Sequence, residues 1–186
     1  GKRPFVARLA PSLLAGGATY ESIASRQAAR RYRAPGPLVD VGGHRLHLHC
    51  SGQGSPTVVL DTGLGMPSAS WVLVQPVVAQ WTRVCAYDRA GYGFSDPGPT
   101  PRTSQRIVEE LHTLLDRAGE RPPYVLAGHS FGGFTIRLFA RRFPDQVAGL
   151  VLIDASHEDF ATRLHEADAQ TRQQQRRQMQ RQIELG

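Results

Sequence analysis

Short apolar runs alternate with helical patterns along the central part of the chain. Each run is nearly continuous, which is typical of strands that are buried on both faces of a sheet. The runs are Thr57–Leu60, Thr82–Tyr87, Tyr124–Ala127 and Val147–Ile153. Between them the pattern predicts helices at about residues 70–80, at residues 103–118 and after residue 130. This alternation predicts an α/β protein with a mostly parallel sheet and helices on both faces.

A hairpin is expected to precede these runs. The segments Leu38–Val41 and Arg45–Cys50 flank the pair Gly42-Gly43, and a glycine pair between two short β patterns is typical of a tight turn. The second segment alternates apolar residues with His47 and His49, which predicts one buried face and one wetter face.

Three histidines lie close together in this hairpin, at His44, His47 and His49. Such a cluster raises the question of a metal site, but no carboxylate or cysteine completes a ligand set nearby in the sequence. We therefore expect solvated histidines at a strand edge. No metal or cofactor is predicted for the chain.

Charge is distributed unevenly over the 186 residues. Residues 1–35 contain seven basic residues against Glu21 alone, which accounts for the whole net charge of +6. The other 151 residues contain 15 basic and 15 acidic residues. The basic character therefore belongs to an N-terminal arm, and a nucleic-acid surface on the domain is not predicted.

The arm at residues 1–35 has two interpretations. Its apolar part is interrupted by Arg8 and Pro11 and is too short to span a membrane, and the chain contains no run of about 18 apolar residues. The arm is either an export or membrane-surface element or an amphipathic helix packed on the domain. The localisation therefore stays open between a soluble protein and one that is exported or membrane-associated.

The sequence Gly128-His129-Ser130-Phe131-Gly132-Gly133 joins an apolar run to a helical pattern. This is the context of a nucleophile elbow, a sharp strand-to-helix turn that exposes a reactive serine. Side chains two residues to either side of Ser130 would collide in such a turn, so Gly128 and Gly132 fit both positions. The dipole of the following helix points at the oxyanion that develops during acyl transfer.

Three blocks together resemble the α/β-hydrolase superfamily over roughly residues 37–157. They are Asp61-Thr62-Gly63-Leu64-Gly65, Asp88-Arg89-Ala90-Gly91-Tyr92-Gly93-Phe94-Ser95 and the elbow around Ser130. The first resembles the oxyanion loop, with Thr62 where many members have histidine. The second is similar to a glycine-rich turn of the family, and we expect it to be architectural. The resemblance implies the α/β-hydrolase fold, incomplete at its C-terminal side.

The resemblance also implies a serine hydrolase of carboxylic esters or related acyl substrates. Ser130 would attack the carbonyl, and the amides of Leu64 and Phe131 would form the oxyanion hole. Asp154, at the end of a predicted strand, is either the triad acid or only a strand cap. The alternative function is a hydrolase-fold protein that binds a ligand without catalysis.

The histidine of the triad has no obvious candidate. Only His157 and His165 follow Ser130, both before the position where the family places its base, and His129 is expected to be structural. We expect residues 36–157 to be the N-terminal part of a hydrolase core and residues 158–186 to be the polar start of a lid. A second chain or segment, the C-terminal half of the same hydrolase, is expected to supply the histidine and cover an otherwise bare apolar edge strand.

The two cysteines are Cys50 and Cys85. The resembling fold places their strands side by side. Two cysteines alone do not establish oxidation, so a disulfide and a buried thiol pair both stay open.

Overall fold

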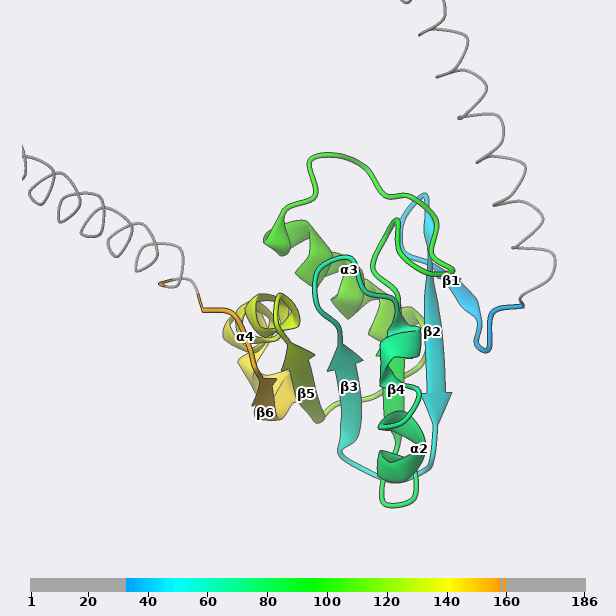
Figure 1. Ribbon diagram of the computed structural model, residues 1–186, viewed down its shortest axis with the longest axis vertical. Coiled ribbons are helices and arrows are strands. Elements are labelled where there is room, and N and C mark those ends of the chain that lie inside the picture. The colour runs from blue at the N-terminus through cyan, green and yellow to red at the C-terminus, as the bar shows by residue number, and fades with distance from the viewer. Residues whose placement is uncertain (1–32, 158, 160–186) are drawn as a thin grey trace, which may run out of the picture. The chain divides into compact units, whose positions relative to one another are not determined.

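The computed structural model contains a six-stranded mixed sheet (Figure 1). Its strands are β1 (Leu38–Asp40), β2 (Arg45–Ser51), β3 (Thr57–Asp61), β4 (Val84–Tyr87), β5 (Tyr124–His129) and β6 (Val147–Ile153). Their order across the sheet is β1-β2-β4-β3-β5-β6. Strands β4, β3, β5 and β6 are parallel, whereas β2 pairs antiparallel with both β1 and β4. The predicted hairpin, apolar strands and mostly parallel sheet are confirmed.

The structure describes residues 33–157 and residue 159. The predicted N-terminal arm, residues 1–35, therefore lies almost wholly outside the described residues, as does the predicted lid segment, residues 158–186. Within the described ranges, no helix combines the length and the apolar character needed to cross a membrane.

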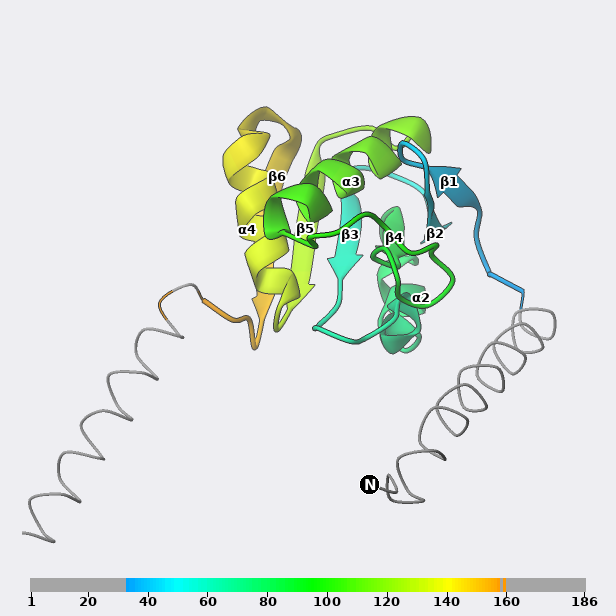
Figure 2. The same ribbon diagram turned by 90° about the horizontal axis from the view of Figure 1, so that it is seen from above.

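Helices cover both faces of the sheet, as predicted (Figure 2). Helices α3 (Ser104–Arg117) and α4 (Gly132–Arg142) lie on one face. The short helices η1 (Ser68–Trp71) and α2 (Gln75–Val78) lie on the other, and a last short helix, η2 (Pro144–Gln146), leads into β6.

The prediction of one helix at about residues 70–80 is wrong. Two short helices, η1 and α2, replace it, and the reason is Pro76 near the start of α2. Proline lacks a backbone N–H, and its ring clashes with the carbonyl four residues earlier. A continuous helix across this position would therefore lose a hydrogen bond, whereas a helix that begins there is unaffected.

Two apolar clusters hold the layers together. Val59 and Leu126 of the sheet pack with Leu111 of α3 and Phe139 of α4, and all four are completely buried. On the opposite face, Leu60, Ala86 and Trp71 belong to a second, smaller cluster. Since neighbouring residues along a strand point to opposite faces, the central strands β3, β4 and β5 contribute to both clusters.

The prediction of solvated edge histidines is wrong for His47 and His44. His47 is completely buried, because β2 lies between β1 and β4 and the turn at residues 88–95 covers it. The His47 N–H donates to Ser95 Oγ at 2.9 Å, and the imidazole contacts the Phe94 ring edge-on. The His44 side chain is also buried, with Nε2 3.2 Å from the Glu110 carboxylate.

Cys50 and Cys85 lie directly opposite each other on β2 and β4 and form a disulfide. The predicted proximity is confirmed, and the oxidation state that the sequence left open is the bonded one in this structure. The bridge joins the antiparallel hairpin to the parallel part of the sheet.

The strand β6 forms an edge of the sheet and is poorly covered. Leu150, Val151, Leu152 and Ile153 are between 38% and 51% exposed. The predicted bare apolar edge is therefore present among the described residues. An edge of this kind offers unpaired backbone groups to another strand.

Candidate active site

Ser130 lies in a tight turn between β5 and α4. Its φ is +50°, a left-handed conformation that is uncommon for a residue with a side chain. A Cβ on Gly128 would lie 2.7 Å from backbone atoms of Gly132, and a Cβ on Gly132 would lie 2.6 Å from the Asp61 oxygen. Both glycines are therefore required by backbone contact, which agrees with the sequence argument for the elbow.

The carbonyl of the peptide that joins Ser130 to Phe131 has two hydrogen-bond donors. The Ser130 carbonyl accepts hydrogen bonds from the Gly133 N–H at 2.9 Å and from the Ser156 N–H at 3.0 Å. In a trans peptide the N–H points to the opposite side from the carbonyl. The Phe131 N–H is therefore directed away from these partners, at the N-terminal end of α4.

The loop after β3 lies against the elbow. A Cβ on Gly63 would be 3.5 Å from the Ser130 Cβ and 3.3 Å from Nδ1 of His129. Leu64, the next residue, is 68% exposed. Within residues 33–157, no group accepts a hydrogen bond from the Leu64 or the Phe131 N–H. The structure thus places the loop that carries Leu64 against the turn that carries Ser130 and Phe131.

Arg89 is a functional candidate that the sequence argument missed. Its buried guanidinium donates from Nη1 to Asp61 Oδ1 at 2.7 Å and to the Thr62 carbonyl at 3.0 Å, and from Nη2 to the Gly63 carbonyl. The loop at residues 61–65 is therefore anchored by a residue from the turn after β4. The signal was the one basic residue inside the glycine-rich block at residues 88–95, but the sequence alone gave no partner for it.

Asp61 is completely enclosed beside Arg89. Burial raises the pKa of this carboxyl to about 6, against the opposing effects of the Arg89 charge and of a hydrogen bond from the Tyr87 hydroxyl at 3.0 Å. The carboxylate and the guanidinium therefore form a buried ion pair above about pH 6. Removing one partner would leave the other charge uncompensated in the interior.

Asp88 holds the turn at residues 88–95 in place. Its carboxylate accepts hydrogen bonds from the Ser68 N–H at 2.5 Å and the Phe94 N–H at 3.0 Å, and it lies 2.9 Å from Nδ1 of His47. Burial alone would raise the pKa of Asp88, but these hydrogen bonds, led by that of His47, lower it below the usual value. These contacts of Asp88 hold the turn together, as expected for this block.

The remaining triad candidates form no hydrogen bond with the Ser130 side chain among the described residues. Asp154 follows β6 with a φ of +41°, and its side chain is exposed. The His157 side chain is 55% exposed, and its Nδ1 accepts a hydrogen bond from the Asp159 N–H at 3.2 Å. His165 lies outside the described residues. Among residues 33–157, no imidazole forms a hydrogen bond with the Ser130 hydroxyl.

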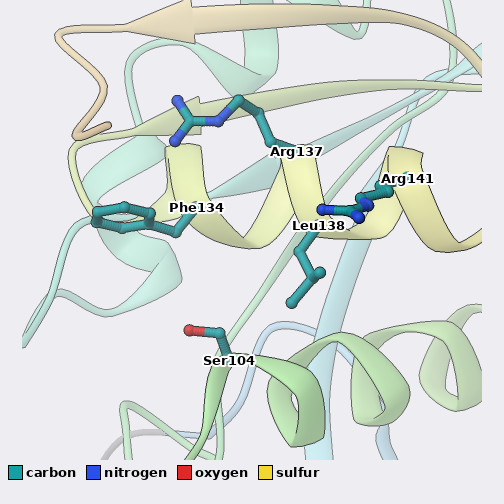
Figure 3. Close-up of a pocket in the computed structure, with 5 residues that line it drawn as sticks. All are labelled: Ser104, Phe134, Arg137, Leu138 and Arg141. Carbon is teal, nitrogen blue, oxygen red and sulfur yellow. The ribbon is translucent and has the colours of Figure 1, made fainter. Parts of the chain in front are cut away.

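A cavity of about 210 Å³ lies between α3 and α4, close to the elbow. It is lined by Ser104, Phe134, Arg137, Leu138 and Arg141 (Figure 3). Leu138 points toward Ser104 at the start of α3, whereas Arg137 extends toward the other side of α4. The Phe134 ring contacts Phe131 edge-on at 5.8 Å. The cavity therefore adjoins the candidate site without containing the nucleophile.

One group of potential metal ligands occurs among the described residues. Donor atoms of Cys50, Cys85 and Glu120 lie within 4.8 Å of one another. The two sulfurs are joined in the disulfide, and both oxygens of Glu120 accept hydrogen bonds from Arg83 at 2.6 Å. In this state the group offers no thiolate, and its carboxylate is already neutralised.

Comparison with known proteins gives a consistent result. A family model described as the alpha/beta hydrolase fold matches residues 56–184. The 2-hydroxy-6-oxo-2,4-heptadienoate hydrolase of Pseudomonas putida is 37% identical over 128 residues, which are 67% of this chain and 46% of that protein.

Solved structures agree with the family match. The enol-lactonase from Burkholderia xenovorans LB400 has a TM-score of 0.61 and 26% identity, and the alignment covers 64% of this chain and 47% of that one. The epoxide hydrolase CorEH has a TM-score of 0.60 and 27% identity, covering 64% and 41%. The chain spans less than half the length of each protein named here.

Proposed function

This chain belongs to the α/β hydrolase fold family, and from this premise we propose that it is a serine hydrolase of carboxylic esters or related acyl substrates. The observation that carries the proposal is Ser130 in a left-handed turn that lies against the loop of Gly63, with the N–H groups of Leu64 and Phe131 left without a partner among residues 33–157. The similar proteins include a lactonase and an epoxide hydrolase, so family membership alone does not select the reaction. A serine nucleophile favours acyl transfer.

The proposed reaction begins with attack by the Ser130 hydroxyl on the substrate carbonyl carbon. A base removes the hydroxyl proton as the new bond forms, and the N–H groups of Leu64 and Phe131 stabilise the oxyanion. Collapse of this intermediate expels the alcohol and leaves an acyl group on Ser130. Water then attacks the acyl-enzyme and regenerates the serine.

The proposed base is a histidine from a segment that pairs with β6. The apolar edge at Leu150–Ile153 supports this proposal, as does the coverage of less than half of each named relative. Asp154 is the proposed acid, because it follows the strand next to β5 and is exposed to such a segment. The same pairing would cover the bare strand.

Labelling with a fluorophosphonate tests the nucleophile. The full-length protein should react once, and mass spectrometry of its peptides should place the adduct on Ser130. A Ser70→Ala variant, which removes an exposed serine of η1, should label like the wild type. A folded full-length protein that binds acyl ligands but never labels would favour the alternative, a non-catalytic binding protein.

Complementation tests the proposed base. Residues 1–186 alone should show no esterase activity, and co-expression with the C-terminal half of the same hydrolase should restore it. Activity of residues 1–186 as a monomer would contradict this proposal and would direct attention to His157.

A further inference from the structure

Arg89 contacts both sides of the proposed oxyanion hole. On the loop side its guanidinium binds the carbonyls of Thr62 and Gly63. On the elbow side it lies over the Phe131 ring, with Cζ 5.1 Å from the ring centroid. The Tyr92 ring contacts the same guanidinium, at 5.5 Å. One buried side chain thus links two segments that are about 70 residues apart in the sequence.

The bond to the Gly63 carbonyl acts on the proposed oxyanion donor itself. Gly63 C=O and Leu64 N–H belong to one trans peptide, so a donor that fixes the carbonyl also fixes the direction of the N–H. The N–H then points away from Arg89. A cationic donor at the carbonyl also polarises the peptide, which makes the N–H a stronger donor.

The guanidinium is well suited to this position. Its fork reaches two carbonyls and one carboxylate at once, which the single ammonium of a lysine does with poorer geometry. Asp61 compensates the charge, and the Tyr87 hydroxyl in turn binds the Asp61 carboxylate. Arg89 is therefore buried without an unbalanced charge.

We propose that Arg89 is a positioning residue that orients and polarises the Gly63–Leu64 peptide and fixes Phe131 beside it, so that both oxyanion donors are preorganised. The inference rests on the proposed function of Ser130. It adds a requirement that the elbow motif does not contain, because the Leu64 donor depends on a side chain from another turn of the sheet.

An Arg89→Lys variant of the full-length protein tests this role on a p-nitrophenyl ester. The charge beside Asp61 is kept while the fork is lost, so kcat should fall about 10- to 100-fold with KM within about twofold. The matched control is Arg117→Lys, whose arginine pairs with Asp40 at the surface and should leave both constants unchanged. In the amide spectrum of the lysine variant, the Leu64 and Phe131 signals should shift.

A second comparison guards against misfolding of the lysine variant. The double variant Asp61→Asn/Arg89→Gln keeps the buried site neutral, and it should lose about 10-fold in kcat relative to Asp61→Asn alone. If Arg89→Lys has the wild-type kcat, and the folded double variant has the kcat of Asp61→Asn alone, the proposed role of Arg89 is wrong. Labelling of Ser130 in the wild type would still support the proposed function in that case. Absence of labelling in the wild type would overturn the proposed function, and this inference with it.

Discussion

The two sides of the proposed oxyanion hole are built in different ways. The Phe131 side is local: the Ser130 carbonyl is held by the Gly133 N–H three residues later, with added support from Ser156. On the Leu64 side, the Gly63 carbonyl accepts a longer bond from the Met66 N–H at 3.4 Å and also binds the charged side chain of Arg89, 26 residues further along the chain. A short motif can encode the backbone bonds within each turn, whereas the Arg89 contact exists only once β3 and β4 lie side by side.

The two sides meet at Gly132. Its Cα faces the carbonyl oxygens of Asp61 and Thr62, and a Cβ would lie 2.6 Å and 2.9 Å from them. The elbow and the loop are therefore in backbone contact at this point. A change on one side can be transmitted to the other through this contact, and the following predictions separate the two contributions.

The largest effect is expected from Ser130→Ala in the full-length protein. Loss of the nucleophile should lower kcat for an ester by about 10⁴- to 10⁶-fold, since only the oxyanion hole and binding remain. Steady-state kinetics and the absence of an acyl-enzyme mass measure it. Ester turnover at the wild-type rate by this variant would exclude Ser130 as the nucleophile.

Gly132→Ala should damage both sides at once. The added methyl group meets backbone atoms that have little freedom to move, and overpacking of this kind costs about 1–3 kcal/mol in the free energy of unfolding. Urea denaturation measures the loss. Gly149→Ala on β6 is the control, because nothing lies within 4 Å of its added Cβ. Equal midpoints for the two variants would show that the close approach at Gly132 is absent.

The Asp61–Arg89 pair predicts a pH effect with a definite sign. Burial raises the pKa of Asp61 to about 6 in the folded protein, whereas the usual value of 3.8 applies when the chain is unfolded. The folded state therefore binds the proton more tightly. The associated stability is complete below about pH 3.8 and is lost as the pH rises to about 6.

Asp61→Asn should remove this decline. The difference in free energy of unfolding between wild type and variant should change between pH 3.8 and 6 and level off above that range. A flat difference for Asp61→Asn would mean that its pKa is not raised by burial.

The contrast between local contacts and contacts from distant parts of the chain also explains what could be predicted from the sequence. The strands, α3 and the elbow have local signatures, namely apolar periodicity and glycines at fixed distances from Ser130, and these predictions held. His47 was placed at a solvated edge because strand alternation does not reveal that Asp88 and Phe94 cover it. The role of Arg89 cannot be seen in the sequence for the same reason. Its partners are two backbone carbonyls and a carboxylate on another strand's loop, and carbonyls have no residue type by which a sequence could identify them.

The smallest effect is expected from Thr62→Val. The Thr62 hydroxyl donates to the Met66 carbonyl at 2.8 Å, which is a hydrogen bond within the loop itself. A neutral bond of this kind contributes about 0.5–1.5 kcal/mol, and Met66 is exposed, so water can replace the lost donor. The Arg89 bonds go to backbone carbonyls and remain in the variant. We therefore expect kcat to fall less than about threefold, a loss well below that of Arg89→Lys measured on the same ester. If Thr62→Val instead lowers kcat as much as Arg89→Lys, the loop is held by its local hydrogen bond, and the contrast between a local elbow and a distantly anchored loop fails.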